Sequence, residues 1–303
     1  MSAALIESVL VAGAGSIGIG VARSCAAHGL RTTVLSRDPA RLEGQVPGAE
    51  LVRELPARAP DLVVECLPEV MALKLSFYAD VERRWGGSPV LATNSSGLPL
   101  QELAAPLAHP AQFLGMHYMY PAHERGLFVE VIRVRETADA AVQAVLQLLQ
   151  RCDKTAIVLN RPVIGGLFNR LQHALLREAY HLIDEGAATP EQIDEMARRF
   201  IAPRMCVTGL LQQKDINGLD THARTQRNLR PVLCNDTSPS PFLEGLFERG
   251  EFGLKTGKGF YDWTGADPAE VRVAAERKVA RIVQAMQEVQ DEPGAQLPSR
   301  SRA

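Results

Sequence analysis

The chain has 303 residues, enough for two domains and a sizeable core, and its 33 basic and 35 acidic residues nearly balance. This balance gives no support for nucleic acid or a membrane surface as a partner. The first residues lack a secretory leader pattern, and no apolar run reaches the roughly 18 residues that span a bilayer. Five scattered cysteines without a C-x-x-C pair indicate reduced thiols, so we expect a cytoplasmic protein without a disulfide framework or a metal site.

The first elements of the chain predict a dinucleotide-binding unit. An apolar run at 8–12 predicts a strand, residues 19–28 have a helical pattern, and residues 31–35 predict a second strand. The segment 13–18, Gly-Ala-Gly-Ser-Ile-Gly, lies between the first strand and the helix. This is a G-x-G-x-x-G motif in the order that a βαβ nucleotide site requires.

Each position of this motif has a physical role. Gly13 permits the tight turn, Gly15 lets the backbone approach a pyrophosphate, and Gly18 lets helix and strand pack closely. Ser16 and Ile17 lie just before the predicted helix, whose N-terminus supplies backbone N–H groups and a partial positive charge to the phosphates. We therefore expect these five residues to bind a dinucleotide cofactor.

The end of the second predicted strand bears on the choice of cofactor. Sites that bind NAD usually place Asp or Glu here to bond the ribose 2′-hydroxyl. Ser36 stands at this position, and Arg37 follows it. A hydroxyl and a guanidinium suit a 2′-phosphate, because the repelling carboxylate is gone and a bidentate donor is added. We therefore expect NADP to be preferred over NAD.

Strands and helices continue to alternate. After a turn-rich stretch at 39–60, strands are predicted at 61–66 and 90–94 with a helix at 69–85 between them. In an open parallel sheet, ligands bind beyond the carboxyl ends of the strands. Asn94 is therefore expected beside the cofactor, and Ser95 and Ser96 are candidates to reach a substrate. The alternative is that both serines only cap or turn the chain before the helical stretch 99–107.

Two short predicted strands, 113–118 and 127–134, carry His117 and Glu130, thirteen residues apart. A turn-rich linker joins the strands, so they can lie side by side and bring the two side chains into contact. A buried carboxylate bonded to one imidazole nitrogen fixes the tautomer and raises the basicity of the other nitrogen. The alternative is a core histidine and a strand-end glutamate without a chemical role.

A helix is predicted at 138–152 and a last strand at 155–159. From residue 161 onward, the pattern predicts helices only. A long amphipathic helix at 165–184, with Asn169 near its start, is followed by an N-cap at Thr189 and helical stretches at 205–233, 242–250 and 267–290. The glycine-rich segment 253–259 has the wrong spacing for a phosphate loop and predicts a surface turn. We expect an α/β domain at 1–160, an all-helical domain at 161–291 and a disordered tail at 292–303.

Taken together, several motifs resemble the L-3-hydroxyacyl-CoA dehydrogenase family over most of the chain. The matching segments are 11–18, 61–65, 92–98, 115–118, 129–132, 169–170, 215–220 and 253–262. The resemblance implies a Rossmann domain with a parallel-sheet core, followed by an all-α domain through which the family usually dimerises. A homodimer and a small-molecule substrate are therefore expected.

The resemblance also implies roles for four residues. The family's catalytic histidine falls on His117 and its partner glutamate on Glu130, while Ser96 and Asn169 take the places of a substrate-contacting serine and an asparagine near the nicotinamide. His117 would remove the hydroxyl proton, and Ser96 and Asn169 would donate to the oxygen as it becomes a carbonyl. The expected reaction is the NAD(P)-dependent interconversion of a 3-hydroxy acid or 3-hydroxyacyl group and its 3-keto form.

Departures from the family pattern bear on the substrate. Tyr120 replaces an asparagine before Pro121, and Asp61 follows Ser36 by only 25 positions. That interval is too short for the helical arm that contacts CoA in the family, so a substrate without CoA is expected. Arg125 and Arg204 are candidate carboxylate anchors, with solvated arginines as the alternative. The rival functions are a 3-hydroxyacyl-CoA dehydrogenase of fatty-acid degradation and a non-catalytic NAD(P)-binding sensor or structural protein.

Overall fold

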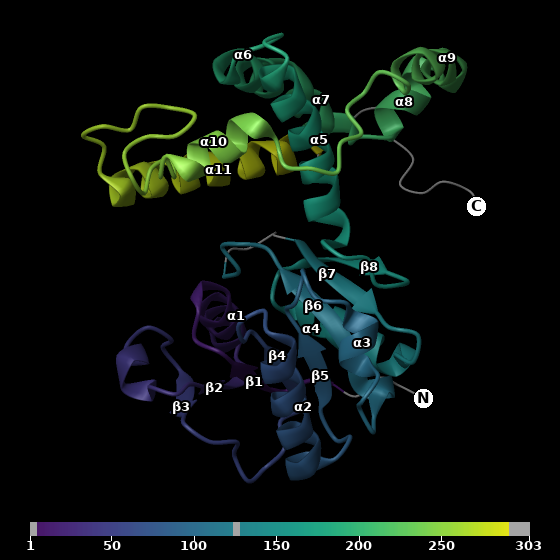
Figure 1. The fold of residues 1–303 in the computed structure, drawn as a ribbon. Coiled ribbons are helices and arrows are strands. Elements are labelled where there is room, and N and C mark those ends of the chain that lie inside the picture. The colour runs from purple at the N-terminus through teal and green to yellow at the C-terminus, as the bar shows by residue number, and fades with distance from the viewer. Residues whose placement is uncertain (1–4, 124–127, 291–303) are drawn as a thin grey trace. The chain divides into compact units, whose positions relative to one another are not determined.

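The computed structural model describes residues 5–123 and 128–290. The chain divides into two compact units, Met1–Leu171 and Gln172–Ala303, and each is considered by itself (Figure 1). The division falls inside helix α5, later in the chain than residue 160. Among the described residues, no helix is both long and apolar enough to cross a membrane.

An eight-stranded sheet forms the centre of the first unit, in the order β3-β2-β1-β4-β5-β6-β7-β8. Neighbouring strands are parallel except β6 and β7, which pair antiparallel. The order reverses between β1 and β4, which is where an open α/β sheet binds its ligand. The strands are β1 (Ser8–Ala12), β2 (Arg31–Leu35), β3 (Ala49–Val52), β4 (Leu62–Glu65), β5 (Val90–Thr93), β6 (Phe113–Tyr118), β7 (Phe128–Arg133) and β8 (Thr155–Leu159).

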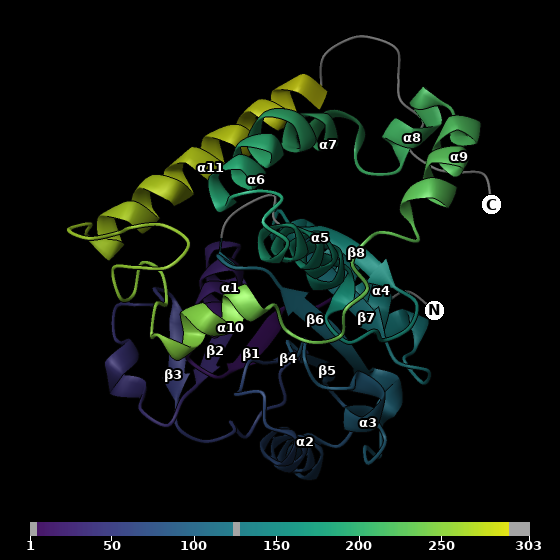
Figure 2. The same ribbon diagram turned by 45° about the horizontal axis from the view of Figure 1, so that its top comes forward.

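Helices cover both faces of this sheet (Figure 2). Helices α1 (Ser16–Ala27) and α4 (Asp139–Arg151) pack on one face, and α2 (Met71–Trp85) and α3 (Leu100–Ala104) pack on the other. Side chains of β1 alternate between the two cores, since Val11 lies in the first and Leu10 in the second. This arrangement confirms the predicted α/β Rossmann architecture.

One strand was not located from the sequence. Strand β3 (Ala49–Val52) lies at the edge of the sheet and is only partly buried, so its sequence, AELV, lacks the apolar run that marks a central strand. The rest of the interval between β2 and β4 contains the short helix η1 (Pro39–Leu42). The structure describes this whole interval, and it contains no helical arm, as the sequence predicted.

The second unit is helical, as predicted. Helix α6 begins with the predicted cap, a reciprocal capping box between Thr189 and Gln192. The predicted helical stretch 205–233 is instead broken at Gly209 and Gly218, both of which have positive φ. The predicted tail at 292–303 lies outside the described residues. The elements are α5 (Gly166–Asp184), α6 (Pro190–Met196), the π-helical η3 (Ala197–Ile201), α7 (Ala202–Thr208), α8 (Gln212–Asn217), α9 (Leu219–Leu229), α10 (Pro241–Glu248) and α11 (Pro268–Gln290).

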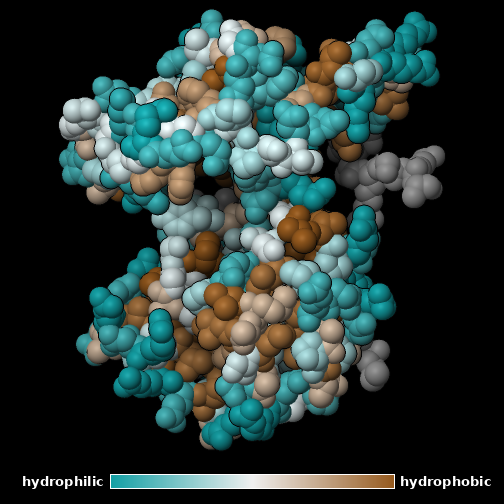
Figure 3. Space-filling view, in the orientation of Figure 1, coloured by the Kyte–Doolittle hydropathy of each residue, from teal (hydrophilic) through white to brown (hydrophobic). Residues whose placement is uncertain are grey.

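The helical unit has little core of its own. Among its described residues, Cys234 and Leu246 are the only buried apolar side chains, and many large apolar residues are exposed. Apolar side chains at the surface are visible in Figure 3. Helix α5 illustrates this, because Leu175 and Leu182 of this unit, together with Leu171 just before it, form an exposed stripe at helical spacing. Helices normally bury such a stripe against another element.

Candidate active site

A buried histidine–glutamate pair lies on the antiparallel strands β6 and β7. His117 and Glu130 are directly opposite each other in the register, as the sequence predicted. Nδ1 of His117 lies 2.8 Å from Oε2 of Glu130. His117 is 7% exposed and Glu130 is 2% exposed. Strand pairing therefore fixes the contact, and burial shields it from water.

The other carboxylate oxygen of Glu130 binds the start of helix α5. Oε1 accepts hydrogen bonds from the backbone N–H groups of Leu167 at 2.7 Å and Phe168 at 2.8 Å. A carboxylate at a helix N-terminus satisfies unpaired donors and complements the helix dipole. One side chain thus holds the histidine and begins the helix.

The protonation state of this pair follows from its bonds. Burial acts to raise the pKa of Glu130, but the hydrogen bonds from His117, Phe168 and Leu167 outweigh it and lower the pKa below its usual value. An ionised carboxylate can only accept, so Nδ1 of His117 must donate to it. Nε2 is the ring nitrogen left to exchange a proton, and it has no hydrogen-bond partner among the described residues.

Ser96 and Asn169 are connected to the same region through the backbone. The carbonyl of Ser96 accepts a hydrogen bond from the N–H of Gly165 at 2.8 Å. Asn169 lies in the first turn of α5, which Glu130 holds at its N-terminus, and its side chain is half-buried. Ser96, His117, Glu130 and Asn169 therefore lie around the carboxyl ends of β5 and β6, the start of β7 and the start of α5.

Asn94 has a structural contact that the sequence did not predict. Its side-chain oxygen accepts a hydrogen bond from the N–H of Tyr118 at 2.8 Å, and its own N–H donates to the carbonyl of Glu65. Asn94 thereby joins the ends of β4, β5 and β6. This join holds in place the strand ends from which the Ser96 turn and His117 project.

The glycine motif fits a dinucleotide at the start of α1. A Cβ on Gly13 would lie 2.5 Å from the carbonyl oxygen of Cys66, and one on Gly18 would lie 2.1 Å from the carbonyl oxygen of Gly13. Both positions therefore require glycine for packing, as predicted for Gly18. Gly13 was predicted to permit a tight turn, and its φ is +110°. A Cβ on Gly15 would meet nothing within 4 Å, and no side chain caps α1. The N–H groups of Ser16 and Ile17 begin the helix beside this open space and suit a pyrophosphate.

Gly15 offers a clean test of this site. Its φ of −76° suits any residue, so Gly15→Ala is expected to leave the melting temperature unchanged. The added methyl group would occupy the space through which a pyrophosphate approaches, so the affinity for NAD+ should fall by tenfold or more, which is about 1.4 kcal/mol or more. Calorimetric titration with NAD+ and thermal unfolding measure the two effects. Unchanged affinity would remove the pyrophosphate from this turn.

At the end of β2, Ser36 is partly buried and Arg37 is exposed. The Ser36 hydroxyl accepts a hydrogen bond from the N–H of Asp38 at 3.2 Å, and the Asp38 carboxylate lies 3.8 Å from the guanidinium of Arg41. A carboxylate is thus present two residues beyond the expected position and is paired with an arginine. This geometry can serve a ribose hydroxyl as well as a phosphate.

Three further residues were singled out from the sequence for a possible effect on substrate binding. Tyr120 is 63% exposed at the end of β6. The guanidinium of Arg204 lies 3.6 Å from the ring centroid of Phe200 in the helical unit. Arg125 lies outside the described residues.

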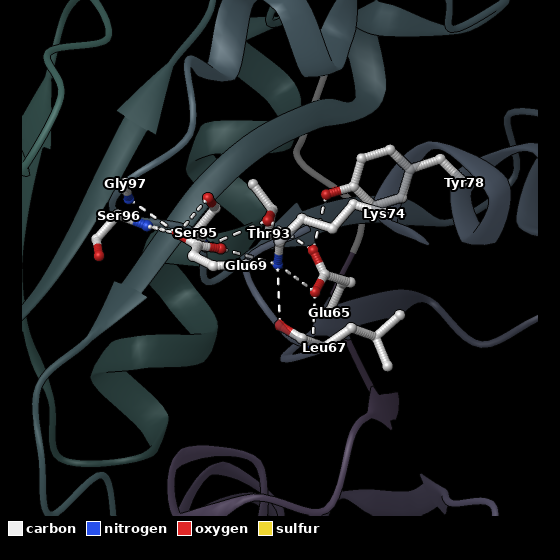
Figure 4. Close-up of polar contacts among 9 residues, drawn as sticks. All are labelled: Glu65, Leu67, Glu69, Lys74, Tyr78, Thr93, Ser95, Ser96 and Gly97. Carbon is white, nitrogen blue, oxygen red and sulfur yellow. Dashed lines mark hydrogen bonds and ion pairs between the residues drawn. The ribbon is translucent and has the colours of Figure 1, made fainter. Parts of the chain in front are cut away.

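A network of charged side chains beside Ser96, with Glu65 and Lys74 buried, was not predicted from the sequence. Glu65, at the end of β4, binds Lys74 of α2, and Lys74 also contacts Glu69 (Figure 4). One feature of the sequence could have indicated this network: the apolar strand Leu-Val-Val-Glu ends in a charged residue.

The cysteines are all free thiols, as predicted. One of them belongs to a group of possible metal ligands in the helical unit, formed by His181, Cys234 and Asp236, whose ligand atoms all lie within 4.8 Å of one another. The Cys234 thiol lies 3.7 Å from the Asp236 carboxylate, to which it donates a hydrogen bond. These residues are distant in sequence from His181, so their spacing gave no signal.

Two domain models of one family match the chain. The NAD-binding domain of 3-hydroxyacyl-CoA dehydrogenase matches residues 53–162, and the C-terminal domain of the same family matches residues 165–263. The probable 3-hydroxybutyryl-CoA dehydrogenase of Bacillus subtilis is 30% identical over 285 residues, which cover 85% of this chain and 98% of that protein. The 5-formyl-3-hydroxy-2-methylpyridine 4-carboxylate 5-dehydrogenase of Mesorhizobium japonicum is 26% identical over 302 residues, covering 92% and 97%.

Solved structures agree with these matches. A crystal structure of 5-formyl-3-hydroxy-2-methylpyridine 4-carboxylic acid 5-dehydrogenase, an NAD+-dependent dismutase, has a TM-score of 0.86 at 25% identity and covers 93% of this chain and 99% of that one. The (S)-3-hydroxybutyryl-CoA dehydrogenase PaaH1 from Ralstonia eutropha has a TM-score of 0.68 at 25% identity and covers 85% and 99%. With both domains matched in order, the chain belongs to the 3-hydroxyacyl-CoA dehydrogenase family of NAD-dependent oxidoreductases that act on CH–OH groups.

Proposed function

We propose that His117 and Glu130 form the acid–base pair of this oxidoreductase and that its substrate is a hydroxy or carbonyl compound without CoA. The observation that carries the first part is the buried 2.8 Å bond from Nδ1 of His117 to Glu130, which leaves Nε2 to accept a proton. An ionised Glu130 stabilises the imidazolium that forms. In the reverse direction, His117 gives the proton back.

Ser96 and Asn169 complete the proposed site. Both side chains can donate hydrogen bonds to the substrate oxygen as it becomes a carbonyl, and they lie on segments that the backbone joins through Gly165. When bound, NAD supplies the acceptor of the hydride. The turn of Gly13, Gly15 and Gly18 would hold its pyrophosphate, and Asn94 marks the strand ends beside its nicotinamide half.

The family binds NAD. The residues that follow β2 determine whether this chain prefers NAD or NADP. The expected preference for NADP rests on Ser36 and Arg37 alone, and neither the NAD-binding domain model nor the NAD+-dependent relative supports it. Kinetic constants measured with both cofactors test the preference. A lower KM for NADP would support the roles of Ser36 and Arg37, and a lower KM for NAD would assign the ribose contact to the displaced Asp38.

The absence of CoA from the proposed substrate rests on the short connection between β2 and β4. This connection holds one short helix and the edge strand β3, and it offers no helical arm for an adenine nucleotide. The TM-score is 0.86 with the pyridine carboxylate dehydrogenase against 0.68 with the CoA-dependent one, at equal identity. A free 3-hydroxy acid or a ring-bearing alcohol or aldehyde fits a site of this kind.

A direct comparison of substrates tests this proposal. We expect kcat/KM to be higher for a free 3-keto acid or a ring-bearing aldehyde with a neighbouring carboxylate than for acetoacetyl-CoA. A higher value for acetoacetyl-CoA would favour the rival, a 3-hydroxyacyl-CoA dehydrogenase of fatty-acid degradation. Free CoA added as an inhibitor provides the control, since it should not compete.

We further propose a cytoplasmic homodimer formed through the helical unit. The five free cysteines support a reducing compartment. The exposed stripe on α5 and the scarcity of buried apolar residues support a second copy as the partner, since obligate homodimers resemble a core cut in half.

A charge placed in this stripe should separate the subunits. Leu175 is 56% exposed on α5, and Leu175→Glu is expected to shift the protein from dimer to monomer, because burying an unpaired carboxylate at an interface is costly. Leu73→Glu is the matched control, since Leu73 is 42% exposed on α2 of the other unit. Analytical ultracentrifugation measures both. A monomeric unmodified protein would contradict the proposal.

A further inference from the structure

A set of three charges, two of them buried, lies beside the turn that carries Ser96. Lys74 is 1% exposed, and its ammonium lies 2.6 Å from Oε1 of Glu65 and 3.3 Å from Oε2 of Glu69. Figure 4 shows Lys74 between these two carboxylates. Glu65 is buried as well, whereas the side chain of Glu69 is 41% exposed. An ammonium and a carboxylate in so dry a place would be costly without further partners.

Both carboxylate oxygens of Glu65 accept further hydrogen bonds. It accepts hydrogen bonds from Tyr78 at 2.7 Å and Thr93 at 2.7 Å through Oε2, and from the N–H of Leu67 at 2.6 Å through Oε1. These contacts fasten the end of β4 to α2 and to the end of β5. The ammonium of Lys74 is therefore held at a fixed place in the core.

Glu69 uses its two oxygens differently. Oε1 accepts three hydrogen bonds from successive residues of one turn: from the Ser95 hydroxyl at 2.7 Å, the Ser96 N–H at 2.9 Å and the Gly97 N–H at 2.8 Å. Oε2 faces Lys74. Burial acts to raise the pKa of Glu69, but the bonds from Gly97 and Ser95, the charge of Lys74 and the bond from Ser96 lower it, so the group is ionised at neutral pH.

We propose that Glu69 is a positioning residue that fixes the Ser95–Gly97 turn, and with it the Ser96 hydroxyl, through a carboxylate that Lys74 ties to the core. This inference rests on the proposed role of Ser96 as a donor to the substrate oxygen. Two contacts hold the turn: Glu69 accepts a hydrogen bond from the Ser96 N–H, and the Ser96 carbonyl accepts one from the Gly165 N–H. A hydroxyl that must meet a reacting oxygen gains from such restraint, because a displacement of about 1 Å can cost about 100-fold in rate.

The experiment has two independent readouts. Glu69→Ala is expected to lower kcat between about tenfold and 100-fold, and to speed amide exchange at Ser96 and Gly97. In a Ser96→Ala background, the same substitution should change kcat by less than about twofold, because residues that act as a unit are not additive. Glu69→Gln keeps an oxygen for the three donors, so it should recover most of kcat and of the amide protection. It also supplies the test if Glu69→Ala does not fold.

Glu82 provides a matched control. It lies on α2, the helix that carries Lys74 and that begins two residues after Glu69, and its carboxylate accepts hydrogen bonds from the N–H groups of Ala108 and His109 in another turn. Glu82→Ala should speed exchange at those amides and leave kcat unchanged.

The outcomes separate this inference from the proposed function. If Ser96→Ala leaves kcat unchanged, the role of Ser96 fails, and the fixation of the turn is judged from amide exchange alone. Unchanged exchange at Ser96 and Gly97 in Glu69→Ala overturns the inference. An equal loss of kcat in the presence and absence of Ser96 also overturns it, because Glu69 would then act by another route.

Discussion

His117→Ala is expected to lower kcat by about 10² to 10⁴-fold and to leave the affinity for NAD+ unchanged. The proposed base is Nε2 of this side chain, since Nδ1 is committed to Glu130. The glycine turn that would hold the pyrophosphate lies after β1, so its contacts do not depend on the imidazole. Single-turnover kinetics measure the chemical step, and calorimetric titration measures the binding of NAD+.

The control for this prediction is another histidine with a carboxylate neighbour. Nε2 of His28 lies 3.5 Å from Asp153, and its Nδ1 lies 2.8 Å from the carbonyl of Ser24. His28→Ala therefore removes a comparable contact on α1, outside the strand ends that form the site, and kcat should stay unchanged. Turnover that survives His117→Ala at the level of His28→Ala would show that the base is a different group.

Much of the first unit followed from the sequence, because its signals are local. Apolar runs of strand length marked seven of the eight strands, and the linker length between β6 and β7 placed His117 opposite Glu130. Strand β3 was not located because edge strands need no apolar run. The breaks at Gly209 and Gly218 were missed because a glycine inside a helical pattern can either continue or end it.

The features of the site that could not be predicted from the sequence are contacts between segments that are distant in the chain. The sequence placed Glu69 and Lys74 only within a predicted helix at 69–85, yet the Lys74 side chain is buried and contacts the carboxylates of both Glu65 and Glu69. The second function of Glu130, as the cap of α5, joins residues 37 and 38 positions apart. No periodicity encodes such pairs, because they arise only when the sheet and the helix are in place.

Gly166→Ala is expected to damage both the site and the fold, although position 166 carries no side chain. A Cβ at this position would lie 2.1 Å from Oε2 and 2.9 Å from Cδ of Glu130. Glu130 would have to move, and it would lose its bond to His117, its bonds to the start of α5, or both. The φ of Gly166 is +61°, so alanine also costs about 1–2 kcal/mol of backbone strain. A lost helix cap adds about 1 kcal/mol.

Gly165→Ala is the matched control. The φ of Gly165 is +83°, so the strain is similar, but its Cβ would meet only ordinary contacts, the nearest being Arg170 Cγ at 3.5 Å. We expect Gly165→Ala to lower the free energy of unfolding by about 1–2 kcal/mol with kcat nearly unchanged. Gly166→Ala should lose about 1–3 kcal/mol more, since a buried carboxylate loses partners, and kcat should fall about 100-fold. Urea unfolding and steady-state kinetics measure these differences.

A third variant shows whether Glu130 is the cause. In a Glu130→Ala background the overlap disappears, so adding Gly166→Ala should cost only the backbone strain and should change kcat little further. If Gly166→Ala still lowered kcat strongly in that background, the loss would come from the path of the chain into α5 and not from the displaced carboxylate. Gly166 would then be required for the backbone path that places Asn169, three residues further along the helix, and not for the histidine–glutamate pair.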